Sequence, residues 1–274
     1  MSGPRVFASI DLEGITGVCR PAQTEHGTDD WQAARRLMRD DLDAVLEGCL
    51  EAGAEEVVVC DAHDHGDNLG VGGLPPAVRL VSGTGLALSM MAGVEDGFDA
   101  ALFVGYHAMA GTAEATLAHT YTDEIARVVV TGGPEGDLPT GELGINAAVA
   151  GAFGTPLVFA SGDDKLAAEA AAFVPGIEAV TVKDGLSWTA ARLQAPDAAR
   201  AALRAAARRA LTGPPPALVD WNGRGLRIAY ARPDFCDGPT ACPGVTRLDG
   251  TTVEIAPADW LTVFTTFIAC MHLM

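Results

Sequence analysis

Two carboxylates, Asp11 and Glu13, directly follow the short apolar run Arg5–Ile10. The run predicts a β-strand, and side chains two residues apart on a strand point to the same face. Two carboxylates held side by side repel each other unless a cation or a shared proton lies between them. The stretch therefore predicts a cation site at the end of a strand, with an acidic turn after an edge strand as the alternative.

A histidine follows each of two later apolar runs. Residues 56–60 are followed by His63, and residues 100–105 by His107. Taken alone, a histidine in such a position is more often a hydrogen-bonded core residue. However, the carboxyl ends of parallel strands meet at one edge of an open α/β sheet, and such sheets bind their ligands there. We therefore expect both imidazoles to lie near Asp11.

A further acidic residue, Glu142, lies in the first turn of an alanine-rich helix predicted from residue 141 to about residue 153. The simplest interpretation is a charge that complements the helix dipole. With the strand ends it makes a set of three carboxylates and two imidazoles: Asp11, Glu13, His63, His107 and Glu142. Dinuclear sites of this composition share a bridging carboxylate between ions ~3.5–4 Å apart and hold a hydroxide that attacks a carbonyl or phosphoryl centre. Mixed oxygen and nitrogen donors favour zinc, manganese, cobalt or iron(II) over calcium.

The elements that must position these side chains alternate along the first part of the chain. A helix over residues 31–52 separates the first two strands, and such β-α-β units build parallel sheets. The pattern continues with a strand at 156–160 and helices at 165–173 and 195–211, before the linker-like run Gly-Pro-Pro-Pro at 213–216. Three antiparallel strands (226–231, 245–248 and 252–255) and a helix (258–274) follow. We predict an α/β fold: a mostly parallel sheet with flanking helices and the dinuclear site in residues 1–212, and a smaller α+β region in residues 217–274.

Composition limits the possible partners. The chain has 274 residues, 49% of them hydrophobic, and carries 18 basic and 36 acidic residues, for a formal charge of −18. Such a charge argues against nucleic acid or an anionic membrane surface as a partner. The six cysteines show no C-x-x-C spacing, which fits a reducing cytoplasm. The apolar run before Asp11 and Glu13 is only six residues long and no positively charged region precedes a longer one, so we expect no secretory leader. The most apolar segment, 261–274, is shorter than the ~18 residues of a membrane span. We expect a cytoplasmic protein in which that segment is a buried helix.

Six stretches in register make the sequence resemble the zinc-dependent D-aminopeptidases once called dipeptide transport proteins. They are SIDLEGITG, CDAHDHGDNL, ALFVGYHAMA, an isolated His119, GELGINAAVAG and ASGDDKLAAE, and they span residues 9–169. The resemblance implies that Asp11 bridges two zinc ions, with Glu13 and His63 completing one site and His107 and Glu142 the other. It implies that His119 is a catalytic histidine that does not bind the metals. It also implies a ring-shaped homo-oligomer, a decamer whose active sites face an inner chamber.

The sequence thus predicts a zinc-dependent aminopeptidase with two zinc ions per chain. Its substrates would be short peptides or amino-acid amides, from which it would release the N-terminal residue, a D-amino acid by the resemblance. The residues themselves do not decide between D- and L-residues or set the peptide length. His119 would donate to the oxyanion or shuttle a proton.

Two other functions remain as alternatives. The stretches FASIDLEGITGV and SGDDK also resemble motifs of haloacid-dehalogenase-type magnesium phosphatases, in which Asp11 would be a phosphorylated nucleophile. That family has aspartate where Glu13 stands, and its mechanism does not require His63, His107 or Glu142. The other alternative is a non-catalytic peptide-binding protein with a structural metal. Structural zinc sites are usually closed by four Cys or His ligands, whereas this set is rich in carboxylates.

Overall fold

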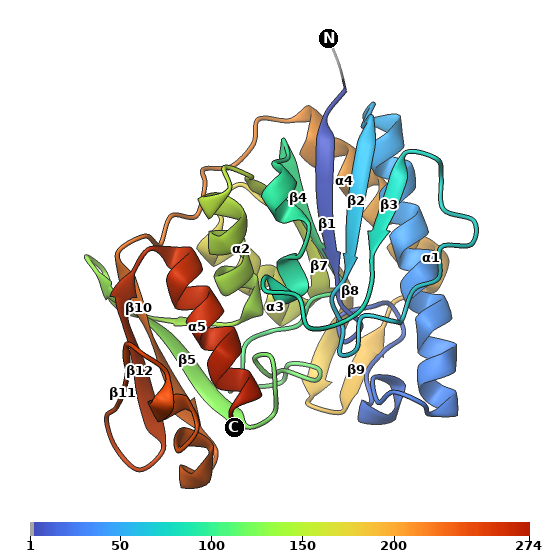
Figure 1. Ribbon diagram of the computed structural model, residues 1–274. Helices are drawn as coiled ribbons and strands as arrows, with labels where there is room; N and C mark the ends of the chain where they lie inside the picture. Colours follow the sequence, from blue (N-terminus) through green and yellow to red (C-terminus); the bar gives the residue numbers. More distant parts are fainter. Residues whose placement is uncertain (1–2) are drawn as a thin grey trace.

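The computed structural model describes residues 3–274, which form a mixed α/β fold with two sheets (Figure 1). The larger sheet has the strand order β3-β2-β1-β4-β7-β8-β9. All its pairs are parallel except the last, β8 with β9. The strands are β1 (Arg5–Ile10), β2 (Glu56–Asp61), β3 (Val78–Val81), β4 (Ala100–Val104), β7 (Leu157–Asp163), β8 (Glu178–Ser187) and β9 (Ala190–Leu193). The predicted mostly parallel sheet is confirmed.

The strand order reverses between β1 and β4. From β1 the chain adds β2 and β3 on one side and then returns to place β4 on the other. Ligands of open α/β sheets bind outside the carboxyl ends of the strands at such a switch point. In the register of the sheet, Ile10 pairs with both Asp61 of β2 and Val104 of β4, so the three strands end at the same level. The segments that carry the predicted ligands therefore leave the sheet side by side.

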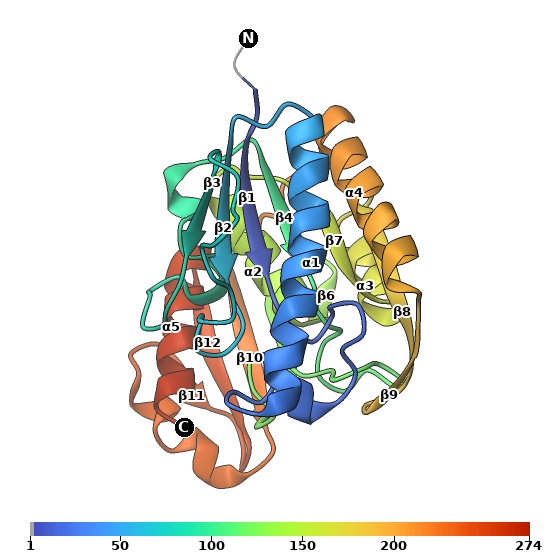
Figure 2. The same cartoon turned by 90° about the vertical axis from the view of Figure 1, so that its right-hand side faces the viewer.

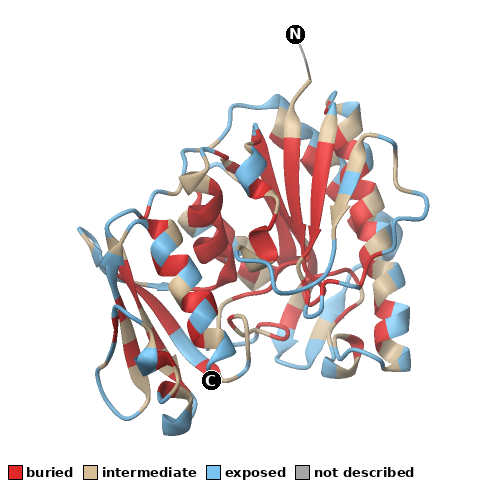
Figure 3. Cartoon of the chain, viewed as in Figure 1, coloured by how far each residue is buried: buried red, intermediate tan, exposed pale blue. Residues whose placement is uncertain are grey.

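Helices cover both faces of this sheet. Helices α1 (Asp29–Glu51) and α4 (Pro196–Thr212) pack against each other on one face (Figure 2). Helices α2 (Glu142–Ala152) and α3 (Asp164–Phe173) belong to the core on the other. Alternate side chains of a strand point to opposite faces. In β1, Val6 and Ala8 accordingly join the core under α1, whereas Phe7 joins the core under α2. The central strands are buried on both faces (Figure 3), which explains their continuous apolar runs.

The second sheet is antiparallel, with the order β11-β12-β10-β5-β6. Its strands are β5 (Ile125–Gly133), β6 (Gly136–Thr140), β10 (Arg224–Tyr230), β11 (Val245–Arg247) and β12 (Thr252–Ala258). Helix α5 (Trp260–His272), predicted as a buried helix, lies between this sheet and α2 (Figure 1). Its Phe264 and Phe267 are fully buried.

The hairpin β5–β6 comes from the middle of the chain, yet it pairs with β10 rather than with the parallel sheet. One apolar core runs from Leu143 of α2 through Phe264 of α5 to Ile228 of β10. The division of the chain into residues 1–212 and 217–274 stays a prediction, and the second sheet draws two of its five strands from the first of these regions. Among residues 3–274, no helix combines the length and hydropathy that crossing a membrane requires.

Candidate metal centre

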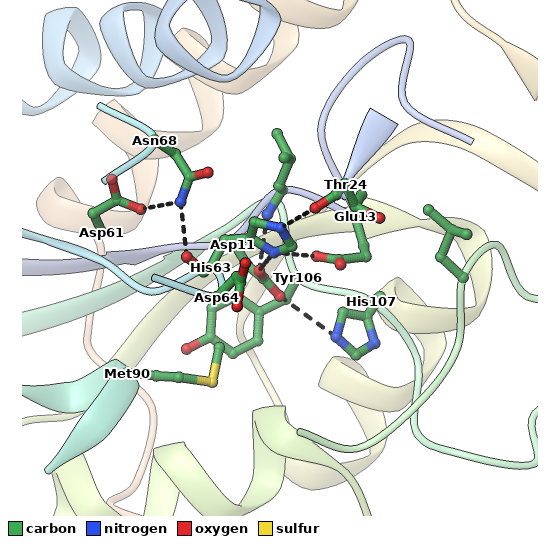
Figure 4. A network of polar contacts seen from close by, with 12 residues as sticks. Asp11, Glu13, Thr24, Asp61, His63, Asp64, Asn68, Met90, Tyr106 and His107 are labelled. Atoms are coloured by element: carbon green, nitrogen blue, oxygen red, sulfur yellow. Dashed lines mark hydrogen bonds and ion pairs between the residues drawn. The ribbon is translucent and has the colours of Figure 1, made fainter. Parts of the chain in front are cut away.

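The five predicted ligands meet at the carboxyl ends of β1, β2 and β4, with Asp11 at the centre. Figure 4 shows four of them, Asp11, Glu13, His63 and His107. The Oδ1 atom of Asp11 lies 3.2 Å from Nδ1 of His63. Its Oδ2 atom lies 3.4 Å from Nε2 of His107. Each carboxylate oxygen thus faces a different imidazole. This is the arrangement that a carboxylate needs to bridge two cations.

The carboxylates of Glu13 and Glu142 each lie beside one of the two imidazoles. Oε2 of Glu13 lies 3.1 Å from Nδ1 of His63. Oε1 of Glu142 lies 3.2 Å from Nε2 of His107. All five side chains are buried, at most 8% exposed. The structure thus brings the five predicted ligands together as two groups that share Asp11, one with Glu13 and His63 and the other with His107 and Glu142.

His119 lies at the same centre. Its ring stacks on that of His107 with the centroids 4.0 Å apart, and its Nε2 is 3.8 Å from Oε1 of Glu142. Ligand atoms lie within 4.8 Å of one another in two groups, His107 with His119 and Glu142, and Asp11 with Glu13 and His107. The His119 side chain is 20% exposed, so it stands between the buried ligands and the cavity. It is therefore near enough to act on a molecule bound at the centre.

A backbone carbonyl binds one ring nitrogen of each of the three histidines. Thr24 O accepts from Nε2 of His63 at 2.9 Å and Ala108 O from Nδ1 of His107 at 3.1 Å. Leu117 O accepts from Nδ1 of His119 at 2.8 Å. A carbonyl can only accept, so in a neutral imidazole the other nitrogen presents a lone pair, and that nitrogen faces the carboxylates. Such an outer hydrogen bond is how metal-binding histidines are oriented.

Polar atoms in this cluster are buried without a hydrogen bond. They include Nε2 of His107 and Oε2 of Glu13. Burying unpaired polar and charged groups is costly unless they pair or coordinate a metal. Nitrogen lone pairs and carboxylate oxygens that converge from several sides suit a divalent cation. The residues present therefore fit a metal centre.

Two glycines allow the loops that carry Asp11 and His107 to touch. Gly14 N donates to Gly105 O at 2.7 Å, and a Cβ at Gly14 would lie 1.9 Å from the carbonyl oxygen of Tyr106. Gly105 has φ +68, and a Cβ there would lie 2.4 Å from the carbonyl oxygen of Asp11. Only glycine fits such a close approach of two backbones.

Supporting hydrogen bonds fix the loop that carries His63. Asn68 donates to the carbonyl oxygen of His63 at 2.7 Å and to Oδ1 of Asp61 at 2.9 Å (Figure 4). Trp31 of α1 in turn donates to Oδ1 of Asn68 at 2.8 Å. The Asn68 amide therefore ties the end of β2 to the loop beyond it, which holds the imidazole in place.

Sequence reasoning missed Lys183 of β8. Its ammonium group is fully buried and donates to three backbone carbonyls, those of Glu13 at 2.5 Å, Ile15 at 3.1 Å and Val18 at 2.5 Å. Burial lowers the pKa of Lys183 to about 8. The side chain thus holds the loop that carries Glu13. The sequence feature that could have indicated a buried lysine is its position directly after the apolar residues Val180 and Val182 of a strand.

Replacing Lys183 by methionine is expected to destabilise the protein strongly. The change leaves the buried carbonyls of Glu13 and Val18 without their donor, whereas Ile15 O still accepts from Val18 N at 3.1 Å. Each buried acceptor left unpaired costs about 1–3 kcal/mol, so we expect a loss of at least about 2 kcal/mol. Denaturant unfolding of the purified variant measures it. Lys165→Met is the matched control, because Lys165 is more accessible and pairs with Asp164, and such pairs contribute little. Equal stabilities of the two variants would contradict this role of Lys183.

A cavity of about 480 Å³ opens over the centre. Its walls include Asp11, Glu13, His63, His119 and Glu142. Three further carboxylates line it (Glu25, Asp64 and Asp123), together with the apolar side chains of Leu117, Trp188 and Met271. No lysine or arginine occurs among these lining residues of the described chain. The cavity is thus acidic and large enough for a short peptide.

Comparisons with known proteins identify the family of this chain. Residues 5–269 match the family model described as D-aminopeptidase. The chain is 32% identical over 192 residues to the D-aminopeptidase of Bacillus subtilis, which covers 70% of this chain and 68% of that protein. The structure of the present chain is similar to that of the Zn-dependent D-aminopeptidase DppA from Bacillus subtilis, which is described as a self-compartmentalizing protease. The TM-score is 0.92 and the identity 28%, over 98% of this chain and 97% of that one. The chain therefore belongs to the D-aminopeptidase family of peptide-bond hydrolases.

Proposed function

We propose that this protein is a zinc-dependent D-aminopeptidase that uses a dinuclear site to release the N-terminal residue from short peptides or amino-acid amides. The main support is the position of Asp11, because its two carboxylate oxygens face two different imidazoles. The similar DppA is described as Zn-dependent, which supports zinc as the metal. Zinc takes nitrogen and carboxylate ligands of the kind gathered here.

Asp11 would be shared by two zinc ions, with Glu13 and His63 holding one ion and His107 and Glu142 the other. When bound, such a pair of ions supplies a nucleophile from water near neutral pH and polarises the scissile carbonyl. The carbonyls of Thr24 and Ala108 keep the two imidazoles in the tautomers that this role needs.

The cavity's own side chains favour an N-terminal amine. The carboxylates of Glu25, Asp64 and Asp123 attract an ammonium group, and no lysine or arginine among the described lining residues offsets them. A phosphate ester would meet the same carboxylates as a like charge. This supports an aminopeptidase over the phosphatase alternative.

His119 would move a proton during the reaction. Its Nδ1 is held by Leu117 O, so its Nε2 is the nitrogen free to accept or donate. That atom lies beside Glu142, at the boundary between the ligands and the cavity. We assign it the protonation of the leaving amine or a hydrogen bond to the oxyanion.

The assembly is proposed from the relative. Because DppA is described as self-compartmentalizing, we propose that this chain also forms a homo-oligomer, and specifically the ring-shaped decamer that the resemblance implies. The cytoplasmic location stays a prediction.

One experiment tests the proposed function directly. Purified protein should contain close to two zinc ions per chain and should hydrolyse D-alanine amide faster than L-alanine amide. A chelator should abolish the activity, and added zinc should restore it. Turnover of p-nitrophenyl phosphate with magnesium, without turnover of either amide, would instead show a phosphatase. Metal binding without any turnover would favour the peptide-binding alternative.

Metal affinity is expected to rise with pH. In the protein alone, burial and the charge of Glu13 raise the pKa of Asp11 to about 7. Although burial opposes its charged form, the carboxylates of Glu142 and Asp11 raise the pKa of His107 to about 10. At neutral pH these groups therefore hold protons that a metal ion must displace, and fewer remain as pH rises towards 10. Calorimetric zinc titrations in buffers of different ionisation enthalpy should show proton release at pH 7. An affinity unchanged between pH 6 and pH 8 would contradict this.

A further inference from the structure

The backbone around His119 adopts an unusual conformation. Glu114, Leu117 and Tyr121 have φ values of 54, 53 and 62 degrees, respectively. Positive φ is uncommon for residues other than glycine and persists only where the surroundings impose it. The segment from Glu114 to Tyr121 must therefore be held in shape by contacts from other elements.

Trp188 supplies two of these contacts from the turn between β8 and β9. Its carbonyl oxygen accepts from Leu117 N at 2.9 Å. Its indole Nε1 donates to the carbonyl oxygen of Ala118 at 3.1 Å. Leu117 O in turn accepts from Nδ1 of His119 at 2.8 Å. Trp188 thus binds both Leu117 and Ala118, the two residues that precede His119. Of these two, Leu117 orients the imidazole through its carbonyl.

Other contacts hold the segment on both sides of Ala118, and one of them lies directly after His119, where Oγ1 of Thr120 accepts from Ala110 N at 3.1 Å. Oδ2 of Asp163 accepts from Thr116 N at 2.8 Å, and Oε1 of Glu142 accepts from Tyr121 N at 2.5 Å. Between these points, Trp188 is the residue that reaches Ala118 from outside the segment. Loss of its indole N–H would therefore loosen the backbone directly beside His119.

The surroundings of Trp188 differ from those of the other tryptophans. Trp31, Trp221 and Trp260 are buried, whereas Trp188 is 41% exposed and lines the cavity over the metal centre. An aromatic ring that stays this accessible contributes less to the core than a buried one. Its position in the cavity wall places it where a bound substrate would touch it.

We propose that Trp188 is a positioning residue for His119 and an apolar wall of the substrate cavity. The indole N–H holds the carbonyl of Ala118, between His119 and Leu117, whose own carbonyl orients the His119 ring. The exposed face of the indole contacts substrate. This inference rests on the proposed function, because it assigns a task to a residue of the same site.

Trp188→Phe tests the positioning role, since it keeps a ring in the wall and removes only the N–H donor. With D-alanine amide as substrate, we expect kcat to fall about 3- to 10-fold, the range for loss of one hydrogen bond. KM and zinc content should stay near the wild-type values. In a His119→Ala background the same change should have no further effect, because coupled residues are not additive. Trp188→Ala also removes the wall and should raise KM as well.

Leu186→Ala is the matched control, because Leu186 lies on the same hairpin and is 51% exposed but does not line the cavity. It should leave kcat and KM unchanged. An unchanged kcat in Trp188→Phe, or an equal loss with and without His119, would overturn the inference while the proposed function stands. A wild-type protein without activity on any aminoacyl amide would overturn both.

Discussion

Replacing Asp11 by asparagine is expected to remove both metal ions and to lower kcat/KM on D-alanine amide by at least about 1,000-fold. We expect a loss of this size in kcat/KM because a catalytic metal stabilises the transition state by several kcal/mol, and each ~1.4 kcal/mol is a factor of ten in rate. Asp11 faces both His63 and His107, so its loss affects both half-sites. His63→Ala and His107→Ala should each mainly lower the metal occupancy of one half-site. Metal analysis and steady-state kinetics on the three variants measure this.

Asp64→Asn is the control for that experiment. Asp64 lines the same cavity but is not one of the five proposed ligands. Its φ of 47 degrees is one that asparagine also tolerates. The control should keep both ions and its kcat, with only a rise in KM from the loss of one of the three carboxylates that attract the substrate's ammonium group. If Asp11→Asn keeps its metal but loses all activity, a nucleophilic aspartate and hence the phosphatase alternative would be favoured.

Replacing His119 by alanine is expected to lower kcat by about 100-fold or more, the usual scale for loss of a general acid or base. The fold and both metals should be kept, because the five proposed ligands remain. If His119 is instead a further ligand, zinc content should fall together with the rate, and its 3.8 Å distance from Glu142 makes this worth measuring. If it only supports the fold, the melting temperature should drop while the rate per loaded molecule stays near wild type.

His65→Ala provides the matched comparison. His65 is exposed, pairs with the neighbouring Asp64 and does not line the cavity. It should change neither kcat nor zinc content. A fully active, fully loaded His119→Ala variant would exclude His119 from the mechanism.

The charge of the cavity bears on the choice among the three functions. Beyond the five proposed ligands, the described walls of the cavity carry the carboxylates of Glu25, Asp64 and Asp123 and no lysine or arginine, so this part of the cavity repels a phosphate group and attracts an ammonium group. A peptide-binding protein with a structural metal needs no imidazole beyond the ligands. The stacked pair of His107 and His119 is explained more simply by catalysis.

The sequence by itself determined which residues would meet. The runs before Asp11, His63 and His107 are apolar because β1, β2 and β4 are buried on both faces, and the helix α1 between the first two strands makes them parallel. Parallel strands end at a common edge, so three ligand-bearing loops had to converge there. Local pattern was sufficient, because each step involves neighbours in the chain or one β-α-β unit.

Tertiary structure alone decided the rest. The run at β5 indicates a strand, but its pairing with β10 depends on matching two edges about a hundred residues apart, which no local pattern records. Likewise, nothing near Lys183 shows that three carbonyls of the loop after β1 surround its ammonium group. The contact of Trp188 with Ala118 also joins distant segments. The physical reason is the same in each case: the free energy of these contacts comes from partners that only the folded chain brings together. The sequence therefore names the proposed ligands of the centre but not the residues that hold them in place.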